Sequence, residues 1–74
     1  MNVTTATKTA EGQMFNLSNG SSLLMKESVT CGGKPCVYPV YVYANGARCS
    51  ARTGRYSATT IVPAMAAVRR FSAA

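Results

Sequence analysis

Acidic and imidazole side chains are scarce in this 74-residue chain, which has two Asp or Glu residues and no His. A nucleophilic Ser or Cys needs a base beside it, and acid–base catalysis commonly needs two carboxylates held near one another. A zinc site would need a fourth ligand beside the three cysteines, and Glu11 and Glu27 are poorly placed in the sequence to supply it. We therefore expect no enzyme, no bound metal, no cofactor and no small-molecule substrate.

Long apolar runs are also missing. No segment reaches the roughly 18 continuous apolar residues that a membrane span needs. The N-terminus lacks the pattern of a charged start, an apolar stretch and a small-residue cleavage site that marks a signal peptide. We expect no membrane partner.

The chain carries a formal charge of +6, but charged residues make up only 14% of it, against about 25% in an average soluble domain. A basic balance favours an anionic partner. Here it results from a lack of acids rather than from a dense basic patch, which is the stronger sign of nucleic-acid binding. We therefore expect a protein partner, itself or another, ahead of nucleic acid.

The turn residues predict the fold. Asn19-Gly20 and Asn45-Gly46 each separate two apolar segments, which indicates two hairpins with two-residue type I′ turns. The segment RYSATTIV, residues 55–62, is rich in β-branched residues and predicts a further strand. Pro63 followed by good helix formers predicts a short helix over about 63–72.

The expected fold class is mainly β, a small antiparallel meander of about five strands with a short C-terminal helix. The sheet could be curled or closed into a barrel. Residues 1–11 are polar and Thr-rich, so we expect a flexible or extended N-terminal arm. Residues 12–74 then form a single small domain, whose stability should be marginal because a chain of this size buries only about 60% of its surface.

The second hairpin defines a candidate binding surface. With Asn45-Gly46 at the centre of the turn, Val, Ala and Cys49 side chains face inward. The outward residues are Tyr41, Tyr43, Arg48 and Arg52, with Arg55 further along the chain. Three readings stay open: a solvated sheet face, a protein interface, and a platform that stacks single-stranded nucleic acid on the two tyrosines.

The first hairpin carries apolar side chains on both faces. With Asn19-Gly20 central, Phe15 lies opposite Leu24 on one face, while Met14, Leu23 and Met25 lie on the other. A strongly twisted ribbon could bury both faces in one core. The alternative is a subunit contact through Met14, Leu23 and Met25.

Cys31 and Cys36 bracket the turn-forming residues Gly-Gly-Lys-Pro. A four-residue turn would bring the two thiols close enough for a disulfide. The alternative is that both stay reduced, which the lack of an export signal favours. Cys49 is then the odd thiol.

Small, weakly charged β proteins rich in Ser, Thr, Ala and Gly, with a loose arm, resemble virion components such as capsid cement, coat or tail proteins. The favoured hypothesis is a non-enzymatic structural or interaction protein, a small subunit of a larger assembly such as a viral (phage) particle. Virion or cytoplasm is then the expected location. The alternatives are a single-stranded nucleic-acid-binding module that uses the Tyr/Arg face, and a small protein inhibitor of a host enzyme.

Overall fold

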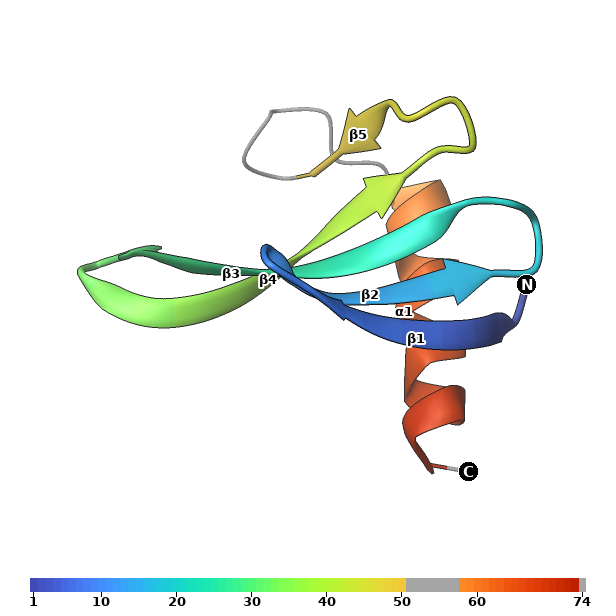
Figure 1. Ribbon diagram of the computed structural model, residues 1–74, viewed down its shortest axis with the longest axis horizontal. Coiled ribbons are helices and arrows are strands. Elements are labelled where there is room, and N and C mark those ends of the chain that lie inside the picture. The colour runs from blue at the N-terminus through green and yellow to red at the C-terminus, as the bar shows by residue number, and fades with distance from the viewer. Residues whose placement is uncertain (51–57, 74) are drawn as a thin grey trace.

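The computed structural model describes residues 1–50 and 58–73, apart from the side chains of residues 30 and 31. Within these residues five strands form one antiparallel sheet in the order β1-β2-β3-β4-β5, and one helix lies across a face of it (Figure 1). The elements are β1 (Val3–Thr9), β2 (Gly12–Leu17), β3 (Ser22–Cys31), β4 (Lys34–Val42), β5 (Arg48–Cys49) and α1 (Ala58–Ala73). The expected fold class is confirmed, and the sheet is open rather than closed into a barrel.

The N-terminal segment belongs to the sheet. The sequence predicts a flexible or extended arm over residues 1–11. Val3–Thr9 is extended, but as strand β1 of the sheet, paired with β2 from Val3↔Leu17 to Thr9↔Gly12. β1 thus takes the place of the strand expected over 55–62. Of that segment, residues 58–62 belong to α1, and residues 55–57 lie outside the described part of the chain.

The helix α1 begins at Ala58, five residues before the expected start, and continues through Pro63. Proline has no N–H to donate, and it disfavours helical geometry in the residue before it. The buried side chain of Ile61 outweighs this cost, because it extends the apolar contact of α1 with the sheet by one more turn. Ala64, Ala67 and Val68 continue that contact along the helix.

Both Asn-Gly turns are three-residue loops instead of the expected two-residue type I′ turns. The Gly20 N–H donates to the Leu17 carbonyl at 3.2 Å, and the Gly46 N–H donates to the Tyr43 carbonyl at 2.8 Å. The glycines therefore end their turns, with φ of 85° and 88°, and no residue other than glycine has a positive φ in the described chain. This is a type I turn closed by a left-handed glycine, another common hairpin loop.

The extra loop residue shifts both hairpin registers by one. Phe15 pairs with Leu23, whereas a two-residue turn would pair it with Leu24. Tyr41 pairs with Cys49, whereas a two-residue turn would pair it with Ser50. Because side chains alternate between faces, a shift of one moves residues to the opposite side of the sheet. The core between sheet and helix consequently contains Phe15, Leu17, Leu23, Tyr41, Cys49, Ile61, Ala64, Ala67 and Val68.

The sheet face away from α1 is also partly buried. Leu24 and Val40 pair directly across β3 and β4, and both side chains are buried although neither belongs to the core under the helix. Both faces of the β3–β4 pair therefore carry buried apolar side chains, in keeping with a twisted ribbon.

The third hairpin turns at Gly32 and Gly33, which have φ of 62° and 77°. Cys31 pairs with Lys34, so this is a two-residue turn and not the expected four-residue one. The ends of β3 and β4 that this turn joins project past β1 and β2 as a two-stranded ribbon (Figure 1). This ribbon provides the first candidate interaction surface.

We expect Gly12→Ala to destabilise the fold strongly. A Cβ at this position would lie 2.1 Å from the Met25 carbonyl oxygen, and Gly12 has a φ of 142°. Steric overlap together with backbone strain should lower the free energy of unfolding by roughly 2–6 kcal/mol. Urea denaturation measures this. Gly46→Ala is the control, since a Cβ there meets nothing within 4 Å and should cost only about 1–2 kcal/mol. Equal losses in the two variants would contradict the close approach at Gly12.

Candidate protein-interaction surfaces

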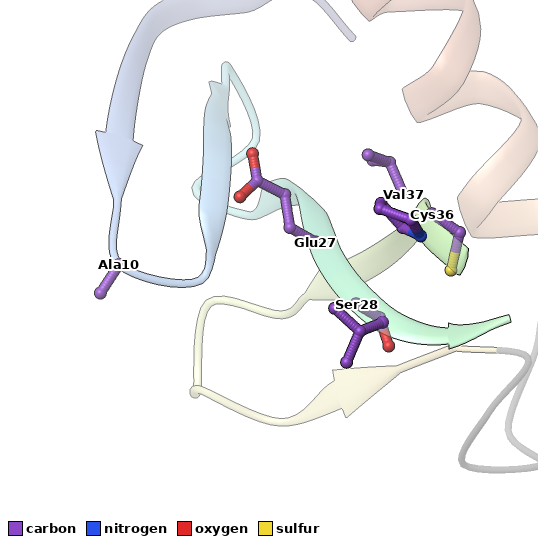
Figure 2. Close-up of a pocket in the computed structure, with 7 residues that line it drawn as sticks. Ala10, Glu27, Ser28, Cys36 and Val37 are labelled. Carbon is purple, nitrogen blue, oxygen red and sulfur yellow. The ribbon is translucent and has the colours of Figure 1, made fainter. Parts of the chain in front are cut away.

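The β3–β4 ribbon exposes aliphatic side chains. Val29 on β3 is 71% exposed and Val37 on β4 is 56% exposed. They border an open groove of about 640 Å³ between the ribbon and the β1–β2 turn, where Figure 2 shows Ala10. The lining residues are Ala10, Glu27, Ser28, Val29, Pro35, Cys36 and Val37. This groove, with mainly small apolar walls, can accept side chains of another protein.

An ion pair connects the two sides of the groove. Lys8 Nζ at the end of β1 lies 2.8 Å from Glu27 Oε1 on β3. Both side chains are exposed, so the pair contributes little to stability. It does neutralise the single charged residue of β1.

Cys36 lines the groove and is disulfide-bonded, so the reduced state that the lack of an export signal favoured is wrong for this residue. The side chain of Cys31, the other residue of the expected disulfide, lies outside the described part of the structure, so that pairing stays a prediction. Cys49 is a buried thiol outside any disulfide bond, as expected from the sequence.

Glu11 joins three parts of the sheet. Its carboxylate accepts two hydrogen bonds from the Arg48 guanidinium, both at 2.9 Å, and one from Lys26 Nζ at 2.8 Å. These hydrogen bonds, that of Arg48 first, lower the pKa of Glu11 to about 2. The same interaction raises the pKa of Arg48. The β1–β2 turn is thereby tied to β3 and β5.

Tyr41 does not lie on the expected outward Tyr/Arg surface, because the register shift turns it inward. Tyr41 is 3% exposed, donates a hydrogen bond to Ser21 Oγ at 2.6 Å and accepts one from Asn19 Nδ2 at 3.2 Å. Tyr43 is 38% exposed and packs edge-on against Tyr41, with ring centroids 4.9 Å apart. Arg48 is exposed but held by Glu11. Arg52 and Arg55 lie outside the described residues.

The expected subunit contact is divided between two faces. Leu23 is completely buried in the core, and Met25 packs against that core from the same face. Met14 is half-buried on the opposite face, where it pairs with Leu24. These three residues therefore do not share one outer surface.

Sequence reasoning missed a second apolar area, at the outer edge of β1. The Phe71 ring near the end of α1 is 42% exposed and packs edge-on against Phe15, 6.1 Å between centroids. Met1 is also exposed, and its carbonyl accepts a hydrogen bond from Arg70 at 3.4 Å. The good helix formers after Pro63 predicted a helix in this part of the chain. They could not show where the sheet beneath the helix ends.

Among the side chains that the structure describes, which exclude that of Cys31, no group of three or more Cys, Asp or Glu lies close enough to hold a metal ion. None of the helical residues described forms a segment long and apolar enough to cross a membrane. Comparisons with protein-family models, curated proteins and solved structures find no match.

Tyr41→Ala tests the assignment of this ring to the core. We expect it to lower the free energy of unfolding by about 3–5 kcal/mol, as for other buried aromatic truncations. Tyr43→Ala should cost less than about 1.5 kcal/mol, mainly the lost ring contact. Chemical denaturation of both variants provides the measurement, and a larger loss at Tyr43 than at Tyr41 would be inconsistent with the observed register.

Glu11→Gln tests the ion-pair cluster through its pH dependence. The pKa of Glu11 is lowered from 4.5 to about 2 in the folded chain. Its ionised form therefore stabilises the fold above pH 4.5, and this contribution is lost as the pH falls through about 2. The difference in Tm between wild type and Glu11→Gln should be largest above pH 4.5 and should disappear as the pH falls to about 2. Added salt should reduce this difference, because it screens the ion pairs.

Glu27→Gln serves as the matched control, because it removes the chain's other carboxylate, which has a single ion-pair partner. A pH-independent Tm difference for Glu11→Gln would show that the carboxylate charge does not stabilise the fold.

Proposed function

We propose that this chain is a non-enzymatic interaction protein that works as a small subunit of a larger protein assembly, such as a viral particle. The observation that carries the proposal is the exposure of Val29 and Val37 on the projecting β3–β4 ribbon, beside an open groove. A small soluble domain gains nothing in its own stability from aliphatic side chains held in water. They become favourable when a partner covers them.

The ribbon is well suited to reach a neighbouring subunit. It extends past β1 and β2 (Figure 1), so a partner can approach it with little steric hindrance from the rest of the domain. The side chains of Val29, Pro35 and Val37 are compact and lose little rotamer freedom on burial, which lowers the entropic cost of binding. A partner with small apolar side chains would complement the groove.

The nucleic-acid alternative has less support. Tyr41 is buried in the core, so its ring is not exposed for a base to stack on. Three of the basic residues, Lys8, Lys26 and Arg48, are ion-paired to the two carboxylates of the chain. A host-enzyme inhibitor would use the same exposed apolar residues as an assembly subunit, so the identity of the bound protein distinguishes these two.

The test is purification of the tagged full chain from its native cells, compared with the double variant Val29→Ser, Val37→Ser. We expect wild type to bring down stoichiometric protein subunits. Loss of two buried valines from an interface should cost at least about 1.4 kcal/mol, a tenfold decrease in affinity. Sedimentation of the recovered complex over a dilution series measures that decrease.

Val62→Ser is the matched control, since Val62 is similarly exposed but lies on α1, away from the ribbon. Equal weakening by both changes would count against a role for the ribbon. Recovery of nucleic acid alone, or a monomer with no partner at any concentration, would overturn the proposal, and recovery of a single enzyme would select the inhibitor alternative.

A further inference from the structure

β1 forms an outer edge of the sheet. It is first in the strand order and pairs only with β2 among the described strands. Five of its seven residues are exposed, and none is proline. Its outer backbone N–H and C=O groups can therefore accept a further strand. Natural edge strands are often protected by a charged side chain, but the one charge in β1, on Lys8, is already neutralised by Glu27.

The end of α1 extends beyond this edge. Figure 1 shows the C-terminal part of the helix passing behind β1 and continuing past it. Residues 69–73 are all exposed, as expected where the sheet no longer lies beneath the helix. Phe71 contacts Phe15, and Phe15 pairs with Ala6 at the middle of β1. Phe71 is 42% exposed, so part of its ring stays uncovered near this edge of the sheet.

Charge determines which partner fits this site. Arg69 and Arg70 are exposed in the same part of the helix, and Arg70 reaches the Met1 carbonyl beside the start of β1. The whole chain has two carboxylate side chains, and both are held in ion pairs with its own lysines and Arg48. A second copy would bring further arginines and no unpaired carboxylate side chain. The complementary partner is an acidic segment of another protein.

We infer that the open edge of β1, together with the overhanging end of α1, binds an extended acidic segment of a partner protein as an additional strand. Main-chain hydrogen bonds to β1 hold the segment, an apolar side chain of the segment packs under Phe71, and its carboxylates face Arg69 and Arg70. This inference rests on the proposed function, because it assigns a second surface of an interaction protein and the chemistry of its partner.

The test uses a display library of random ten-residue peptides selected on the immobilised full chain. We expect enriched peptides to alternate apolar residues with Asp or Glu. In NMR titrations, the best peptide should shift and protect the amides of residues 5–9 and shift the Phe71 ring signals. Arg70→Glu should weaken this peptide at least tenfold. Lys34→Glu, the same charge reversal at the exposed turn end of the ribbon, should change its affinity less than twofold.

Several results would overturn the inference. These are the absence of enriched peptides, enrichment of basic peptides, binding without protection of β1, and equal weakening by Arg70→Glu and Lys34→Glu. The variant Val29→Ser, Val37→Ser separates this inference from the proposed function. If it abolishes peptide binding, the peptide occupies the ribbon groove, so the edge site is wrong while the role as an interaction protein stands.

Discussion

The left-handed glycine that ends each Asn-Gly turn sets the register on which the sheet depends. Gly20 and Gly46 each place three residues in the loop, and both hairpins are therefore shifted by one position from a two-residue turn. That shift puts Leu23 and Tyr41 under α1, next to Cys49. A core of this kind could not form in the alternative register, because Tyr41 would then point away from the helix.

The sheet face away from α1 carries a cluster of ion pairs, whereas the other face packs against the helix. The Glu11 carboxylate binds Arg48 and Lys26, so one acidic group links the β1–β2 turn to β3 and β5. Because the chain has so few acids, this cluster and the Lys8–Glu27 pair use all of them. Among the residues that the structure describes, Lys34, Arg69 and Arg70 have no ion-pair partner and are exposed.

The surfaces available to partners lie where the single helix and the short strands leave the sheet uncovered. α1 covers the middle of one face only, and the β3–β4 ribbon runs on beyond it, which exposes Val29 and Val37. At the other side the sheet ends at β1, and the C-terminal part of α1, which includes the exposed Phe71, extends past it. Both surfaces follow from a mismatch in length between elements. Strand alternation and helical spacing report which residues share a face, but not where a neighbouring element stops.

The sequence by itself determined the mainly β architecture, the positions of three of the turns between strands and the presence of a C-terminal helix, because Gly, Asn and Pro act locally on the backbone. It also determined the excess of positive charge. Only the tertiary structure decided the strand register, the recruitment of Val3–Thr9 into the sheet and the extension of α1 through Pro63. Each of these depends on burial against residues distant in the chain, and the free energy of that contact exceeds the local preference that the sequence displays.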